Sequence, residues 1–274
     1  MATRKMVARS KQRASSDFPR NDLPKEVRLI PISFTDDIQR GDALAEKLLQ
    51  SMRQDALAFE LGDILVVKHK IVSKSEGRIV DLETIKPSTG SLAWAKKYKL
   101  DARVVELSLR ESVAVIRRKD GVLITETKHG FICANSGVDV SNVDGGRHAL
   151  LLPADPDRSA REIHSQLKKL TRLAIPVLVT DTFGRPWREG LVDFCIGIAG
   201  IKPLRDDRGR RDPHGYTLHA SIEAVADELA CAAGLICGKL NRTPACIIRG
   251  FRFHQARNAS ARDLLRPAAS DLFR

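Results

Sequence analysis

The chain has 274 residues, 43% of them hydrophobic, which is enough for one large domain or two small ones with a packed core. It contains no apolar run long enough to span a membrane, and its N-terminus does not resemble a secretory signal. Five cysteines without a C-x-x-C pair favour free thiols in the reducing cytoplasm over a disulfide framework.

The net charge of +12 lies mostly at the two ends of the chain. Residues 1–25 carry seven basic and two acidic side chains and are expected to form a disordered tail, while residues 251–274 carry five and two and form a C-terminal extension. The body, residues 26–250, is only mildly basic and is expected to hold the functional domain. This distribution suits anionic ligands and argues against nucleic acid as a partner.

The first half of the body mixes apolar patterns of helical and extended period. Apolar residues at Leu44, Leu48 and Met52 predict a helix over residues 42–54, and a β-branched run predicts a buried strand over residues 64–67. A pair of helices is expected over residues 91–110. Further strands are expected at residues 27–34, 113–117, 122–127 and 130–134, with a hairpin turn at Asp120-Gly121.

In the second half, residues 157–174 carry a clear amphipathic pattern, and Asp157 is expected to cap that helix. Another helix is expected over residues 222–236, and buried strands over residues 175–179 and 245–249. Helices and strands follow each other without regular alternation, which predicts an α+β fold rather than a doubly wound sheet.

The most informative stretch is VTDTFGRPWREG, residues 179–190. Asp181 and Thr182 come where the predicted strand gives way to a turn, and Arg185 and Arg188 follow. An acid and a hydroxyl can hold a hard cation through oxygen, and two guanidinium groups can hold phosphate or carboxylate. A cation, a phosphate and an acidic substrate at one place are typical of phosphoryl transfer.

A second segment, GDILVVKHKIVSKSEGR at residues 62–78, ends its buried strand in a group of bases that includes His69, Lys70 and Lys74. Cations beside a turn can bind the phosphates of a nucleotide. On composition alone, a solvated basic edge explains these residues better than a nucleotide site does.

A third segment, NSGVDVSN at residues 135–142, crowds Asp139, Ser141 and Asn142 into one short loop. Ligand sets made of oxygen alone select magnesium, manganese or calcium over zinc, although the same residues are also the commonest ones in turns. Beside Asp181, Asp139 becomes the second member of a candidate metal pair.

Two weaker features remain. Residues 206–215 are expected to form a mobile loop that either closes over a substrate or is simply exposed, and Asp227 or Glu228 either reaches the site or faces solvent. No Walker A, serine-hydrolase, zincin or dinucleotide-binding motif is present.

Taken together, these segments resemble the coenzyme F420-0:L-glutamate ligase family, the deazaflavin gamma-glutamyl ligases. The resemblance covers about residues 27–250. It rests, in order, on GDILVVKHKIVSKSEGR, NSGVDVSNV, LLPADPDRSA, VTDTFGRPWREG, EAVADELACAAGLICGK and ACIIRG. It implies an α+β fold, an intertwined homodimer, and the use of GTP with Mg²⁺ or Mn²⁺ and with K⁺.

Residue by residue, the resemblance implies metal ligands at Asp139, Asp181 and Thr182. It places the guanine-nucleotide contacts at Thr35, Asp36, Asp37, Ile38, His69, Lys70, Lys74, Asn142, Cys237, Gly238, Lys239 and Leu240. One departure concerns Lys239, which stands where archaeal members have an acidic or amide metal ligand, in a loop that is one residue shorter here. A charged lysine cannot coordinate a cation, so either part of the metal site is lost or Lys239 contacts phosphate.

The implied reaction is a GTP-dependent ligation of L-glutamate to the lactyl carboxylate of F420-0 through an acyl phosphate. Lys74, Arg185 and Arg188 are expected to position phosphate and carboxylates, and no protein nucleophile is required. Two alternatives stay open: a related acid–amine ligase that acts on another carboxylate, and a nucleotide-binding module without catalysis.

Overall fold

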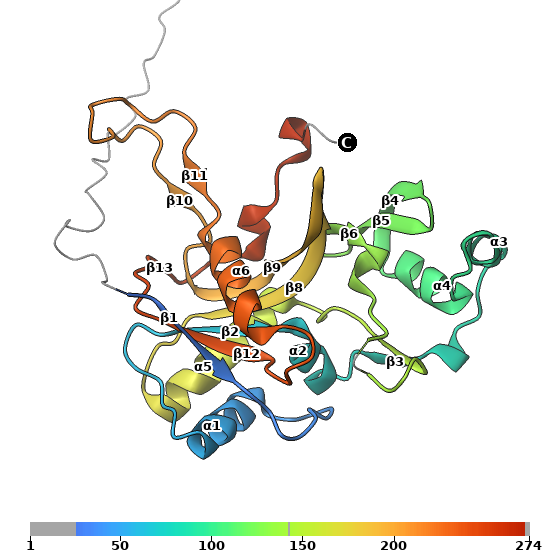
Figure 1. The fold of residues 1–274 in the computed structure, drawn as a ribbon, viewed down its shortest axis with the longest axis horizontal. Coiled ribbons are helices and arrows are strands. Elements are labelled where there is room, and N and C mark those ends of the chain that lie inside the picture. Colours follow the sequence, from blue (N-terminus) through green and yellow to red (C-terminus); the bar gives the residue numbers. More distant parts are fainter. Residues whose placement is uncertain (1–25, 142, 272–274) are drawn as a thin grey trace, which may run out of the picture.

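The computed structural model describes residues 26–141 and 143–271, and a six-stranded mixed sheet lies at its centre (Figure 1). The strand order is β1 (Arg28–Ile32), β12 (Ala245–Arg249), β2 (Ile64–Lys68), β8 (Val177–Arg185), β9 (Arg188–Ile201) and β13 (Gln255–Ala256). β2 and β8 run parallel, and the other neighbours pair antiparallel. The predicted tail, residues 1–25, lies outside the described residues.

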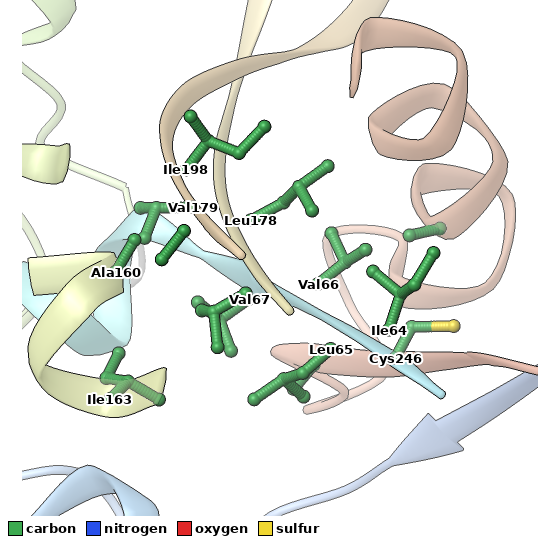
Figure 2. Packing of buried hydrophobic residues seen from close by; sticks show 14 of the residues in the cluster. Ile64, Leu65, Val66, Val67, Ala160, Ile163, Leu178, Val179, Ile198 and Cys246 are labelled. Atoms are coloured by element: carbon green, nitrogen blue, oxygen red, sulfur yellow. The ribbon is translucent and has the colours of Figure 1, made fainter. Parts of the chain in front are cut away.

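Helices cover both faces of this sheet, which explains why β2 is an unbroken apolar run. α1 (Leu44–Gln54) and α5 (Pro156–Thr171) lie on one face and α6 (Val225–Cys237) on the other (Figure 1). Figure 2 shows Leu65 and Val67 of β2 on the side of α5, and Val66 on the side of α6. Because alternate residues serve opposite faces, every position from Ile64 to Val67 is buried.

A second region adds an antiparallel sheet of β4 (Ser112–Lys119), β5 (Val122–Thr127) and β6 (Ile132–Ala134) beside α3 (Thr89–Tyr98) and α4 (Ala102–Arg110). The short strands β3 (Ile79–Asp81) and β7 (His148–Leu150) pair next to it. Asp120 and Gly121 both have positive φ, as the predicted hairpin turn requires. The architecture confirms the predicted α+β class.

Several short segments complete the described fold. α2 (His69–Ser75) follows β2 directly, and β10 (Arg205–Asp206) and β11 (Ile222–Glu223) pair at the base of a projecting arm (Figure 1). Short 3₁₀ turns occupy Leu82–Thr84, Asn135–Gly137, Ala261–Leu264 and Ala268–Ser270. Over residues 26–141 and 143–271, no helix has the length and apolarity needed to cross a membrane.

The predicted cap of α5 was wrong by two residues. Asp155 accepts the backbone N–H of Arg158 and is the N-cap, because Pro156 occupies the first helical position, which suits a residue without an N–H. Asp157 instead accepts the backbone N–H groups of Ile198 and Ala261. It therefore ties β9 to the start of the turn at Ala261–Leu264.

Part of the segment from residue 251 to residue 271 packs against the body. β13 extends the central sheet by pairing with β9, and Ala259 and Ala261 are buried in the core. Phe251 and Phe253 pack against the same core. The described part of the predicted extension thus contributes to the sheet and to the core.

Candidate functional site

The site forms where two parallel strands end side by side. Lys68, the last residue of β2, pairs in register with Thr180 of β8. The next residues along the chain, His69 in α2 and Asp181 in β8, therefore emerge at one edge of the sheet. The predicted turn after residue 179 was wrong: β8 runs on through Arg185, so Asp181 and Thr182 lie within a strand and pair with Phe194 and Asp193 of β9.

A cavity of about 600 Å³ opens at this edge. β8, the β2–α2 junction and three loops supply its walls. Most of the predicted site residues line it together: Asp36, Asp37, Ile38, His69, Lys70, Lys74, Asp139, Asp181, Thr182, Cys237, Gly238, Lys239 and Leu240. Residues as far apart in sequence as Asp36 and Leu240 are thus brought to one place, as the resemblance implied.

The remaining predicted residues lie elsewhere. Thr35 lines a small hollow next to the cavity, which it shares with Asp36 and Asp37. Arg185 and Arg188 flank the turn between β8 and β9 and do not line the cavity, and Arg185 donates to the carbonyl of Gly190 at 3.2 Å. Asn142 lies outside the described residues.

The predicted loop at residues 206–215 belongs to the projecting arm and does not line the cavity (Figure 1). Asp227 is half-buried and accepts the backbone N–H of Cys195 at 2.9 Å, beside the bulge where β8 and β9 shift register, and burial raises the pKa of its carboxyl. Glu228 is exposed. Neither acid is among the lining residues.

Basic side chains hold the acidic ones around the cavity. Lys70 Nζ lies 2.7 Å from Asp139 Oδ2 and also donates to the Ser141 hydroxyl, while Lys74 Nζ is 3.9 Å from Asp37. Burial raises the pKa of Asp139, but hydrogen bonds from Lys70 and from Ser141 outweigh it and hold that pKa below the usual range. Asp139 therefore stays ionised.

Asp181 is held from two sides. The backbone N–H of Thr182 donates to Asp181 Oδ1 at 2.7 Å, and His69 Nε2 lies 3.2 Å from the same oxygen. His69 is 2% exposed, and its Nε2 makes no aligned hydrogen bond. Since this ring faces Asp181 and its Nδ1 faces Ser73 at 3.3 Å, we assign His69 to the support of Asp181.

One acid at this edge was not predicted from the sequence. Asp193 of β9 lies behind the cavity wall, where Lys68 Nζ donates to Oδ2 and Thr182 Oγ1 donates to Oδ1 at 2.7 Å. A signal was available, because Asp193 stands alone in the apolar run LVDFCIGIAG and a buried carboxylate needs a partner. Its partner Lys68 could not be identified without the pairing of the strands.

The oxygen donors fit a cation that arrives with a nucleotide. Asp139, Asp181 and Thr182 all line one cavity, so two carboxylates and one hydroxyl belong to its wall. Among the described residues, no three or more His, Cys, Asp and Glu side chains gather into a ready-made metal cluster. Magnesium typically takes only one or two carboxylates and completes its shell with water and substrate phosphates, so this donor set suits it.

Comparison with known proteins identifies the family of the chain. The family model described as F420-0:gamma-glutamyl ligase matches residues 34–250. The protein named coenzyme F420:L-glutamate ligase from Methanothermobacter thermautotrophicus is 41% identical over 250 residues, covering 90% of this chain and 99% of the relative. Its namesake from Methanopyrus kandleri is 41% identical over 254 residues, covering 90% and 98%.

A third relative with the same name, from Methanocaldococcus jannaschii, is 41% identical over 216 residues and covers 78% of this chain. The family match spans both aspartates, the β2–α2 junction and the loop after α6, so it includes every segment that lines the cavity. The chain belongs to the F420-0:gamma-glutamyl ligase family.

Proposed function

We propose that this protein is a ligase of coenzyme F420 biosynthesis, which uses GTP to join L-glutamate to the lactyl carboxylate of F420-0. The observation that carries the proposal is the meeting of Asp139 and Asp181 at one cavity with Lys70, Lys74 and Lys239. Two acids and several bases around one hollow supply what a metal-bound triphosphate requires. The names of the relatives supply the acid and the amine.

The reaction takes two steps. A carboxylate oxygen of F420-0 attacks the γ-phosphorus of GTP, and the bond from that phosphorus to the β,γ-bridging oxygen breaks. GDP is released, and F420-0 now carries an acyl phosphate. The amine nitrogen of glutamate then attacks the acyl carbon, loses a proton, and the carbon–oxygen bond breaks to release inorganic phosphate. Neither step needs a protein nucleophile, so the task of the protein is to position and stabilise charge.

Each residue then has a role. Asp139, Asp181 and Thr182 would hold Mg²⁺ or Mn²⁺, which when bound neutralises charge on the phosphates. Lys70 and Lys74 point at Asp139 and Asp37 in this structure and would turn to the nucleotide when it binds. The nucleotide itself would lie along Asp36, Asp37 and Ile38 and the loop from Cys237 to Leu240.

Three further features belong to the proposal. K⁺ is a second cation requirement, the homodimer is the functional form, and the cytoplasm is the site of action. Because Arg185 and Arg188 lie outside the cavity, their proposed contact with a substrate carboxylate requires the β8–β9 turn to approach it, either by movement or from a second copy.

The test is incubation with F420-0, L-glutamate, GTP and Mn²⁺, with the product mass and released GDP as readouts. Asp139→Asn and Asp181→Asn should each lower turnover at least about a hundredfold, the scale of losing a transition-state charge stabiliser. The double variant should cost much less than the sum, because both residues act on one ion. Asp120→Asn, at an exposed hairpin turn, is the matched control.

Additive losses in the double variant, or an active Asp181→Asn enzyme, would refute the shared metal site. GDP release with another carboxylic acid, but not with F420-0, would instead identify a related acid–amine ligase. Nucleotide binding without any ligation would favour the second alternative, a nucleotide-binding module without catalysis.

A further inference from the structure

Asp193 connects two residues that line the cavity while it stays outside the lining itself. One of its oxygens accepts from Lys68 Nζ and the other from Thr182 Oγ1. The side chain of Asp193 is 4% exposed and that of Lys68 is 17% exposed. Water therefore screens this ion pair little, and each partner is costly to leave alone.

The hydrogen bond fixes the orientation of the Thr182 hydroxyl. Because its proton is directed at Asp193, the lone pairs of Oγ1 remain for the cavity, which is what a metal ligand needs. Lys68 is fixed in the same way. Its ammonium has three donors, one of which is directed at Asp193, and the side chain lines the cavity beside Asp181 and Thr182.

Packing leaves the Asp193 carboxylate little freedom. α6 passes so close that a Cβ on Gly234 would lie 2.5 Å from Asp193 Oδ2, and Cys231 Sγ approaches the backbone oxygen of Asp193 at 3.2 Å. The carboxylate is thus clamped between helix and sheet. A group held this rigidly is suited to the positioning of others.

We propose that Lys68 is a catalytic residue that contacts the oxygens of the phosphoryl group during its transfer, and that Asp193 is the positioning residue that directs both Lys68 and Thr182 toward that group. The inference rests on the proposed function. It adds a fixed cation next to the proposed metal ligands, at the place where negative charge spreads in the transition state.

Variants of Lys68 separate a catalytic lysine from an ion pair that only stabilises the fold. Lys68→Met should lower turnover at saturating GTP and Mn²⁺ on the order of a hundredfold, and Lys68→Arg should recover much of it by keeping the charge. Lys128→Met, which removes a lysine from the exposed pair with Glu111, should leave turnover unchanged.

Binding supplies a readout that does not depend on ligation. In Mn²⁺ titrations, Lys68→Met should weaken GTP by about tenfold and GDP by less than about twofold, because only GTP carries the transferred phosphoryl group. If the wild type forms no F420 product but Lys68→Met still loses this discrimination, then the proposed function fails and the contact of Lys68 with phosphate stands.

Lys68→Met leaves a buried carboxylate unpaired, so the variant is also made together with Asp193→Asn, which removes both charges. Asp193→Asn alone offers one acceptor oxygen and one NH₂ group, so with Lys68 on the oxygen the NH₂ would donate to Thr182 Oγ1 and reverse the direction of that hydrogen bond. It should lower turnover, and its effect should not add to that of Lys68→Met. Turnover within about twofold of wild type in the folded double variant, or equal losses of GTP and GDP affinity, would overturn the proposal.

Discussion

A buried aspartate forms an ion pair beside each end of β2, and the two pairs are built differently. At the start of the strand, Asp63 is fully buried and receives two hydrogen bonds of 2.8 Å from Arg249. The same guanidinium donates to the carbonyl of Ala58 and pairs with Glu60. At the end of the strand, Asp193 is paired with Lys68, which lines a cavity.

The difference between the two ion pairs indicates a different role for each. Around Asp63 both oxygens accept from a planar fork, and neither Asp63 nor Arg249 lines the cavity, so we assign this pair to stability. Around Asp193 the partners are a lysine and a hydroxyl, whose remaining donors and lone pairs face a space large enough for a ligand. The two pairs are similarly buried and carry the same charges, but only the pair of Asp193 with Lys68 keeps hydrogen-bond donors that can still bind a ligand.

The largest expected effect separates stability from activity at the first pair. Arg249→Met leaves Asp63 buried without its partner and should cost about 3–5 kcal/mol of unfolding free energy. Urea unfolding measures this. Turnover per folded molecule should stay at the wild-type value, because Arg249 lies at the far end of β2 from the cavity; a selective loss of turnover would erase the contrast between the two ends.

Gly234→Ala tests the second pair through its packing. A helical Gly→Ala change usually stabilises by about 0.5–1 kcal/mol, but here the new methyl would meet Asp193 Oδ2 at 2.5 Å. We expect a cost of about 1–3 kcal/mol together with reduced turnover. Gly90→Ala in α3 is the matched control, because a Cβ there meets nothing within 4 Å. Equal effects of the two changes would contradict the clamp on Asp193.

Asp227→Asn tests an acid whose pKa is raised by burial, with no basic side chain among the causes of the shift. Burial raises the pKa of Asp227 above its ordinary value, so the folded state favours the neutral form and wild-type stability falls as pH rises through that raised pKa. Asn keeps an acceptor for the Cys195 N–H and carries no charge. The variant should therefore gain melting temperature over wild type above this window and lose the advantage at lower pH. A constant difference across pH would refute the assignment.

The smallest effect concerns the thiols around α6 and the sheet. Burial raises the pKa of Cys246 to about 12 and that of Cys237 to about 11, and both should stay protonated and inert. Cys231 is only half-buried and should be the first of the three to react. Peptide mass mapping after brief iodoacetamide treatment gives the order, and faster labelling of Cys237 than of Cys231 would show that the cavity wall opens.

Local patterns predicted the elements that depend on local physics. The helix periods at residues 42–54 and 157–174 and the strand at residues 245–249 correspond to α1, α5 and β12. β9 was missed because glycines and Asp193 interrupt its apolar run. The candidate site likewise has residues that local patterns predicted and contacts that depend on the pairing of distant segments.

Asp139 and Asp181 were found from oxygen-rich neighbours and from a family resemblance, and both line the cavity. The pairing of Lys68 with Asp193 joins residues 125 positions apart and depends on the order of β2, β8 and β9 in the sheet. No spacing within the sequence encodes that contact. Arg185 and Arg188 looked close to Asp181 along the chain, but an extended strand carries them away from it.

The place of β12 between β1 and β2 has a consequence for how the protein folds while it is being synthesised. Arg28 of β1 pairs with Arg249 of β12, and β2 pairs with the same strand, which is synthesised about 180 residues after β2. The central sheet can therefore close only after β12 has been synthesised, and until then β1 and β2 lack a neighbour. A chaperone that shields β1 and β2 during translation would have more to protect here than in a protein whose strands pair in the order in which they are made.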